Sequence, residues 1–238
     1  MTTAQPMGFV PASVATDPGY SEEDLARADT YGLLAEWFIR EPSDDLFNRL
    51  AGSPAIDEGD QSDLANAWRN LIQVVASTAP ADAAAEFQNL FIAVGKPLVA
   101  VHASVYVGGA MNHGILVDLR RDLAELGLES NPELGETEDH FSTLCEIMRY
   151  LIAAPDAKGN TLVQQQQFFS AYFQSWVEAF FDALQDQPRA KVYVAVAGFA
   201  RAFFALAFTA RACARARFAH VGSFARTLFL RTRAFCVR

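Results

Sequence analysis

The sequence has little of what marks several common classes of protein. It contains only three cysteines, an odd number without close spacing, which excludes a disulfide scaffold and indicates a reducing compartment. Residues 1–20 contain no Lys or Arg and no apolar run of signal length, so we expect no secretory signal and a cytoplasmic location. An uninterrupted apolar run of about 18 residues is also missing, so we expect no stable membrane insertion.

Acidic residues are missing from the end of the chain. Residues 189–238 hold 10 basic residues and no acid, whereas residues 1–188 hold 9 basic and 28 acidic residues, a net charge of −19. The whole chain of 238 residues has a formal net charge of −9 and is 51% hydrophobic, which is enough for a sizeable core. The Ala/Arg/Phe-rich tail is either a basic amphipathic segment or an extension without function.

Apolar residues recur at helical spacing through most of the chain, and Ser, Gly and Pro mark the ends of these segments. We expect helices over residues 21–40, 43–50, 60–77, 81–91, 111–126, 137–153, 161–185 and 191–208. Strand-like alternation is absent apart from the ambiguous stretch 98–107. The pattern therefore predicts an all-α helical bundle of about seven to nine helices.

A polar stretch with Asn, Pro and Gly near residue 131 predicts a hinge loop over residues 128–140. This loop would separate a larger N-terminal helical part, residues 21–127, from a smaller C-terminal helical part, residues 141–208. A flexible arm over residues 1–20 and the basic tail over residues 209–238 would flank them. Exchange of helices across the hinge is a route to a homodimer that the sequence leaves open.

Few residues are arranged for catalysis. Glu136, Asp139 and His140 could act in a metal-dependent enzyme, because carboxylates and imidazoles bind zinc or iron. Glu136 and His140 are four residues apart and would share a face if both were helical. A closed site needs more ligands at recognisable spacing, so we expect no metal here and interpret the cluster as an acidic helix start. A second alternative is a nucleic-acid-binding or membrane-binding module that works through the basic tail.

Three further features favour structural roles. Cys145 lies on the apolar face of a predicted helix and is expected to be a buried thiol rather than a nucleophile. Arg120 and Arg121 are expected on a solvated helix face. The aromatic stripe within residues 169–181 is expected to be core, or in part to line a groove for an apolar peptide.

Two segments, taken in order, resemble the TorD/DmsD/NarJ family of redox-enzyme maturation chaperones. The first is Glu-Phe-Gln-Asn-Leu-Phe at residues 86–91, followed by a Gly/Pro loop and Ser-Val-Tyr at residues 104–106. The second is Glu-Thr-Glu-Asp-His-Phe at residues 136–141, which is similar to the family's Glu-Pro-x-Asp-His signature. The order and spacing hold from about residue 21 to residue 206.

The sequence departs from the family pattern at three places. Thr137 stands where the family usually has proline. Val101 and His102 stand where some members have Pro-Trp. Ser175 replaces the common proline before Trp176.

The resemblance implies an all-helical, cytoplasmic, non-enzymatic chaperone without a cofactor. Such a chaperone binds the precursor of a molybdopterin oxidoreductase, often through its twin-arginine signal peptide, and assists cofactor insertion before export or assembly; no nucleic acid is expected. An acidic body attracts such a cationic peptide. The expected peptide-binding residues are Phe87, Leu90, Phe91, His102, Ser104, Tyr106, Glu136, Asp139 and His140.

Different members of this set have different expected roles. The apolar side chains would line a groove for the apolar part of the peptide, and ordinary core packing is the alternative for Leu90 and Phe91. Glu136 and Asp139 would pair with the arginines, because a carboxylate accepts a guanidinium in bidentate fashion. His140 would hold the hinge loop or gate binding by protonation.

Overall fold

The computed structural model describes residues 5–6, 21–92, 95–108, 113–129, 135–153 and 162–209, and within these ranges the chain is almost entirely helical. The helices are α1 (Glu22–Ile39), α2 (Asp44–Ala51), α3 (Asp63–Ala76), α4 (Pro80–Phe91), α5 (Ala103–Tyr106), α6 (His113–Leu126), α7 (Phe141–Ala153), α8 (Leu162–Tyr172), α9 (Val177–Gln185) and α10 (Val192–Thr209). The two-residue strands β1 (Gln5–Pro6) and β2 (Leu128–Glu129) pair in parallel. The all-α prediction is confirmed.

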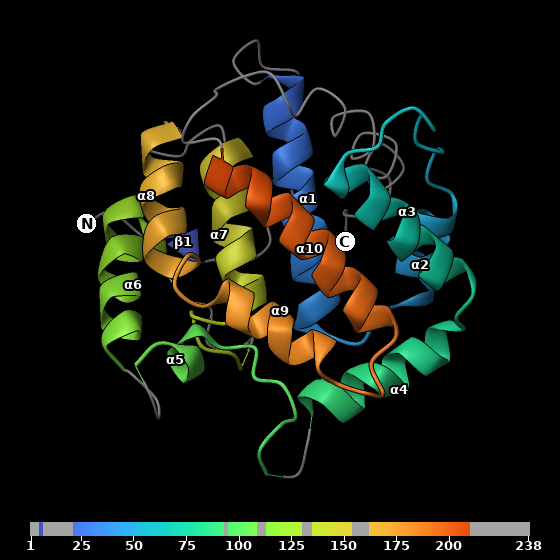
Figure 1. Ribbon diagram of the computed structural model, residues 1–238. Coiled ribbons are helices and arrows are strands. Elements are labelled where there is room, and N and C mark those ends of the chain that lie inside the picture. Colours follow the sequence, from blue (N-terminus) through green and yellow to red (C-terminus); the bar gives the residue numbers. More distant parts are fainter. Residues whose placement is uncertain are drawn as a thin grey trace.

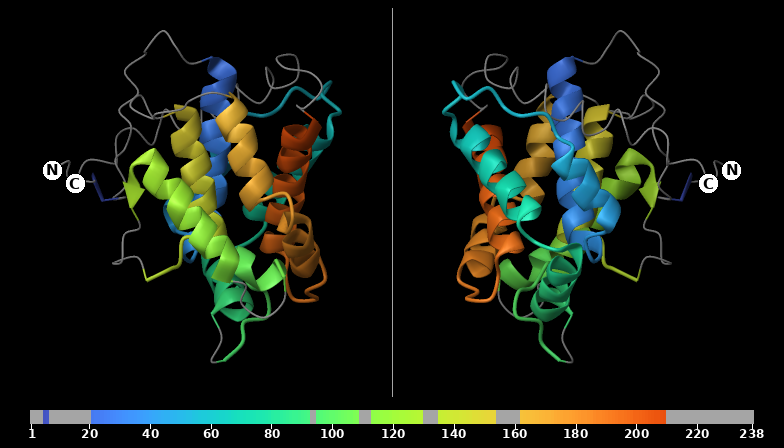
Figure 2. Two further views of the ribbon diagram at one scale, coloured as in Figure 1. Left: turned by 90° about the vertical axis from the view of Figure 1, so that its left-hand side faces the viewer. Right: turned by 90° about the vertical axis from the view of Figure 1, so that its right-hand side faces the viewer.

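The helices form one bundle around α1. Helix α7 packs along α1, and α10 crosses in front of α1 and packs on α3 and α9 (Figure 1). Helices α2 and α3 lie on one side of the bundle and α6 and α8 on the other, as the side views also show (Figure 2). Helices from both sides of the expected hinge thus share one core. The division into two parts at residues 128–140 stays a prediction.

Serine side chains begin the first three helices. Ser21 Oγ accepts a hydrogen bond from the backbone N–H of Asp24, whose carboxylate accepts from the Ser21 N–H, which forms a capping box. Ser43 and Ser62 each accept from the backbone N–H three residues further on. Gly127 follows α6 at φ +75°, a left-handed conformation that glycine adopts without a side-chain clash. These ends agree with the sequence pattern.

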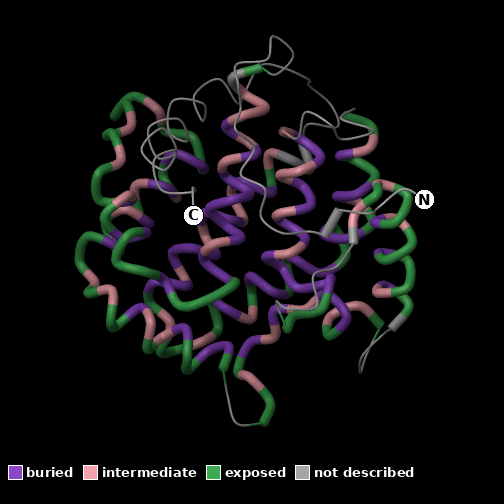
Figure 3. Tube along the Cα trace, turned by 180° about the vertical axis from the view of Figure 1, so that it is seen from behind, coloured by how far each residue is buried: buried purple, intermediate pink, exposed green. Residues whose placement is uncertain are grey.

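Aromatic rings fill the centre of the bundle. The Phe141 ring lies 5.0 Å from that of Phe38 and 5.1 Å from that of Phe180, measured between centroids, and all three side chains are buried. Figure 3 shows buried residues along the inward sides of the helices and exposed residues around the rim. The stripe predicted as core is core: Phe169, Phe181 and the aromatic residues between them are buried. Cys145 is buried as well, as predicted.

The stretch expected as one helix over residues 161–185 is two helices. After α8, the backbone N–H groups of both Phe173 and Gln174 bond to the Phe169 carbonyl, and residues 173–176 form a turn. The Trp176 indole N–H donates to the Tyr172 carbonyl at 2.6 Å. It thereby gives a hydrogen-bond donor to one of the backbone carbonyls that the end of α8 leaves without a helical partner. Buried Trp176 therefore ends the helix, although Ser175 occupies the position of the family's proline.

The ambiguous stretch 98–107 forms no strand. Its residues 103–106 form the short helix α5, and residue His102 makes an isolated bridge with His140. Together with the break after α8, α5 raises the helix count within the described ranges to ten, above the expected seven to nine. Among the helices that the structure describes, none combines the length and apolar character that crossing a lipid bilayer requires. Residues 210–238 of the expected tail, and residues 1–4 and 7–20 of the expected arm, lie outside the described residues.

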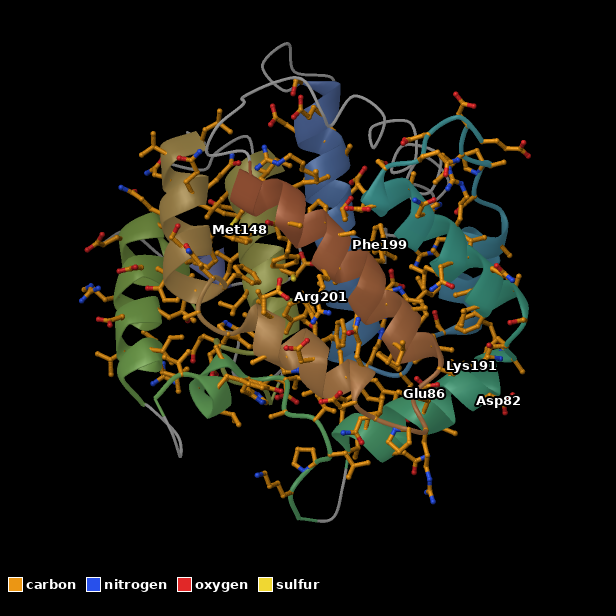
Figure 4. The ribbon with its side chains drawn as sticks, in the orientation of Figure 1. Asp82, Glu86, Met148, Lys191, Phe199 and Arg201 are labelled. Atoms are coloured by element: carbon orange, nitrogen blue, oxygen red, sulfur yellow. The ribbon has the colours of Figure 1, made fainter. Side chains whose placement is uncertain are left out.

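A carboxylate from α4 caps the start of α10. The Glu86 carboxylate accepts hydrogen bonds from the backbone N–H groups of Lys191, Val192 and Tyr193, at 2.8 to 3.1 Å. Figure 4 shows Glu86 beside Lys191 at this end of the helix. The negative charge also faces the positive end of the helix dipole. Glu86 therefore joins two helices that lie about 100 residues apart in sequence.

Replacement of Glu86 by alanine is expected to lower the free energy of unfolding by about 1–3 kcal/mol, because three N–H groups lose a charged acceptor. Urea denaturation measures this change. The control is Asn89→Ala, which changes an exposed residue of the same helix and is expected to alter stability by at most about 0.5 kcal/mol. Equal effects of the two substitutions would contradict the assigned cap.

Candidate functional site

Two loop segments that precede α5 and α7 meet as a short antiparallel bridge. The Ala103 N–H donates to the Asp139 carbonyl at 3.0 Å, and the Phe141 N–H donates to the Val101 carbonyl at 2.8 Å. Both segments come from the two stretches that carry the family resemblance. The bridge brings the Ser-Val-Tyr motif and the Asp-His motif into one site.

Asp139 is fully buried at the centre of this site. Its carboxylate accepts hydrogen bonds from the Ser104 backbone N–H at 2.8 Å and from the Thr137 hydroxyl at 2.5 Å. Burial alone would raise the pKa of Asp139, but these hydrogen bonds and the nearby His102 outweigh it and hold the pKa below its usual value. Asp139 is therefore a buried anion that joins the two loop segments.

Helix α7 begins at Phe141, four residues later than expected. The residues from Thr137 to His140 form a turn, in which the His140 N–H donates to the Thr137 carbonyl. The turn is favoured because its groups hydrogen-bond to the segment before α5 rather than within a helix. The expected helix start at residue 137 was therefore wrong, and Glu136 and His140 share no helical face.

His140 is buried and neutral. Its Nδ1 accepts a hydrogen bond from the Ser142 backbone N–H at 3.1 Å. Burial, with a smaller contribution from the neighbouring His102, lowers the pKa of His140 to about 3, against the opposing effect of Asp139. A neutral side chain at physiological pH fits the expected role of holding the loop better than gating by protonation.

His102, Glu136 and His140 form a cluster at the edge of the site. His102 Nε2 lies 3.2 Å from a Glu136 carboxylate oxygen, and the His102 and His140 rings stand nearly perpendicular with centroids 5.0 Å apart. One ligand atom from each residue lies within 4.8 Å of the other two. The side chains of His102 and Glu136 are 29% and 41% exposed, so the cluster faces solvent. The expected peptide-binding set already contained these three residues, but the metal site considered from the sequence did not include His102.

Arg120 also contributes to the site. From α6 it donates two hydrogen bonds, both 2.9 Å long, to the Glu138 carboxylate, and this interaction raises the pKa of Arg120. The Glu138 side chain is only 7% exposed, whereas that of Arg120 is 57% exposed. The prediction of a solvated position is thus correct for Arg121, which pairs with Asp118 and Asp122 at the surface. For Arg120 it missed the ion pair with Glu138.

Replacement of Arg120 by methionine is expected to destabilise the fold by about 1 kcal/mol, because a nearly buried carboxylate loses this guanidinium. Adding Glu138→Gln should restore part of the loss, since the double variant no longer buries that charge. Urea denaturation of the two single variants and the double variant gives the interaction free energy between Arg120 and Glu138. Arg121→Met is the matched control, and the assignment would be wrong if it destabilised as much as Arg120→Met.

The remaining expected residues divide into two groups. Ser104 and Tyr106 belong to the site: the Tyr106 hydroxyl donates to the Ala100 carbonyl at 2.8 Å, and its ring stacks on Trp176. The aromatic and leucine side chains of α4 belong to the core instead, and these are Phe87, Leu90 and Phe91. Phe87 and Phe91 both pack on Tyr193. The core packing proposed as an alternative for Leu90 and Phe91 is what the structure shows.

A family model for the nitrate reductase delta subunit matches residues 57–182, which is more than half of the chain. The chain belongs to this family of NarJ/TorD-type chaperones. The matched range includes both motif segments and the site between them. Membership supports a general role in molybdoenzyme maturation, and a family of non-catalytic chaperones is compatible with the expectation that the chain is not an enzyme. No curated protein matches the sequence.

Proposed function

We propose that this protein is a cytoplasmic chaperone that binds the precursor of a molybdopterin oxidoreductase through its twin-arginine signal peptide. Binding assists cofactor insertion before the precursor is exported or assembled. The observation that carries the proposal is the family match over a range that contains an acidic, partly exposed site between two family motifs. The family match itself supports the coarser statement, a chaperone of molybdoenzyme maturation.

The exposed carboxylate of Glu136 is suited to receive an arginine of the peptide. It lies at the solvent edge of the site, where a guanidinium can approach and bond to both carboxylate oxygens. Asp139 is fully buried and already accepts two hydrogen bonds. Its proposed contribution is therefore indirect: it holds the Glu136-containing loop against the segment before α5, and direct pairing would require the bridge to open.

The apolar part of the peptide needs apolar contacts outside the core. Phe87, Leu90 and Phe91 are buried and reach a peptide only if α4 moves. Ile92, Leu98 and Val105, by contrast, are 56%, 60% and 41% exposed, and they lie in the chain segment that leads to the site. We propose that these exposed side chains provide the first apolar contacts.

A twin-arginine signal peptide is expected to bind with roughly micromolar affinity in isothermal titration calorimetry. Asp139→Ala and His140→Ala should each weaken binding by about 1–3 kcal/mol, because each removes part of the loop's hydrogen bonding. Since these residues are buried, Glu136→Gln provides a surface test, with Glu125→Gln on α6 as the matched charge control. A peptide with Lys-Lys in place of Arg-Arg should also bind more weakly, because lysine lacks the bidentate fork.

Two results would overturn this assignment. One is parental affinity in all three site variants, provided that circular dichroism shows them folded. The other is an equal loss of affinity for Glu136→Gln and Glu125→Gln, which would indicate a general charge effect rather than a defined site.

The acidic charge is expected to accelerate association. Residues 1–188 carry a net charge of −19, which attracts a cationic peptide at long range. Dissolved salt screens this attraction. Stopped-flow measurements should therefore show an association rate that falls at least about tenfold between 0.05 and 0.5 M NaCl, with a smaller change in the dissociation rate. An association rate independent of salt would contradict electrostatic steering.

A further inference from the structure

A group of metal-ligating side chains lies at the edge of the site. We propose that His102, Glu136 and His140 form a binding site for a divalent transition-metal cation, for which Zn²⁺ is the expected occupant. The inference goes beyond the proposed chaperone function and does not depend on it.

The three side chains supply a suitable set of ligands. Two imidazoles and one carboxylate bind Zn²⁺ through three protein atoms and leave a fourth position for water. The three candidate ligand atoms lie within 4.8 Å of one another, and His102 Nε2 and a Glu136 oxygen are already 3.2 Å apart. Ligands of one tetrahedral Zn²⁺ lie about 3.3 Å from each other, so binding requires the separations to contract by up to about 1.5 Å.

The backbone holds two of the ligands in place before any metal binds. His102 and His140 face each other in the antiparallel bridge, which the Ala103–Asp139 and Phe141–Val101 hydrogen bonds fix on either side. Glu136 enters from the turn that precedes His140, and its partly exposed side chain can adjust. The exposed fractions of His102 and Glu136 also provide a path from solvent to the cluster.

Binding costs hydrogen bonds at two places: metal contacts replace the one between His102 Nε2 and Glu136, and one is lost at His140. His140 Nδ1 accepts the Ser142 N–H hydrogen bond, so the ring proton of neutral His140 lies on Nε2. A metal that binds Nε2 moves this proton to Nδ1 and breaks the hydrogen bond, whereas a metal that binds Nδ1 displaces the Ser142 N–H. Either route loses one hydrogen bond, so we expect an affinity nearer micromolar than that of a preformed four-ligand zinc site.

The ligand set also predicts selectivity. Mg²⁺ and Ca²⁺ prefer oxygen ligands and six or more of them, which a site with two imidazoles and one carboxylate does not supply. Zn²⁺ and Co²⁺ accept nitrogen ligands in tetrahedral geometry. An acidic surface that merely attracted cations would instead bind Mg²⁺ and Zn²⁺ alike.

The test is a titration of the full chain, without any histidine tag, with ZnCl₂, and separately with CoCl₂ and MgCl₂. Calorimetry should give one Zn²⁺ per chain at roughly micromolar affinity, and Co²⁺ should produce the visible absorption of a tetrahedral complex. His102→Ala and Glu136→Gln should each weaken Zn²⁺ binding by on the order of 10- to 100-fold. Glu125→Gln is the matched control and should bind Zn²⁺ like the parent.

Nitrogen-15 NMR of the ring atoms adds an independent readout, because Zn²⁺ should change the tautomer of His140 or the shift of its Nδ1. Zn²⁺ binding that is equal in His102→Ala and the parent, or Mg²⁺ binding as tight as that of Zn²⁺, would overturn the proposal. Repeating the peptide titration in a chelator separates the two hypotheses. Peptide binding that persists without metal leaves the chaperone function intact even if the metal site fails.

Discussion

The site depends on a polar segment that is buried next to an aromatic core. Asp139 carries a charge with no exposed surface, and the hydrogen bonds from the Ser104 N–H and the Thr137 hydroxyl, with the nearby His102, stabilise that charge. The same segment places Phe141 among the central rings. Loss of the buried hydrogen bonds would thus disturb both the loop before α7 and the core. The geometry of the short acidic motif is in this way coupled to the packing of the core.

Most helices could be predicted because their determinants are local. Serine caps at Ser21 and Ser43, the apolar period near 3.6 residues in α3 and Gly127 after α6 placed these helix ends within a few residues. The helix break at Trp176 was missed because it depends on an indole N–H that caps a carbonyl of the preceding helix. Helix periodicity alone does not report such a tertiary hydrogen bond.

The site was predicted only in part, because its contacts also join segments that are far apart in sequence. Glu136, Asp139 and His140 were identified as a motif, but their supposed common helix does not form. His102 lies 34 residues from Glu136 in sequence, and no spacing rule relates them. Arg120 was interpreted as solvated because its partner, Glu138, lies on another element. Contacts between segments had to come from the structure.

The site combines a buried, hydrogen-bonded interior with a partly exposed, charged edge. Buried Asp139 and His140 hold the loop, whereas Glu136 and His102 remain accessible to a guanidinium or a metal ion. The same carboxylate cannot serve both ligands fully, so metal and peptide would compete there. The net charge of −19 over residues 1–188 favours cations of either kind.

The central claim is that a twin-arginine leader binds at the bridge between the segments before α5 and α7. Hydrogen–deuterium exchange of the full chain, with and without the peptide, tests this most directly, because exchange reports the opening of individual hydrogen bonds. The account predicts that the peptide changes exchange chiefly within residues 99–106 and 135–141. Unchanged exchange in both segments, with changes confined to α2 and α3, would contradict it.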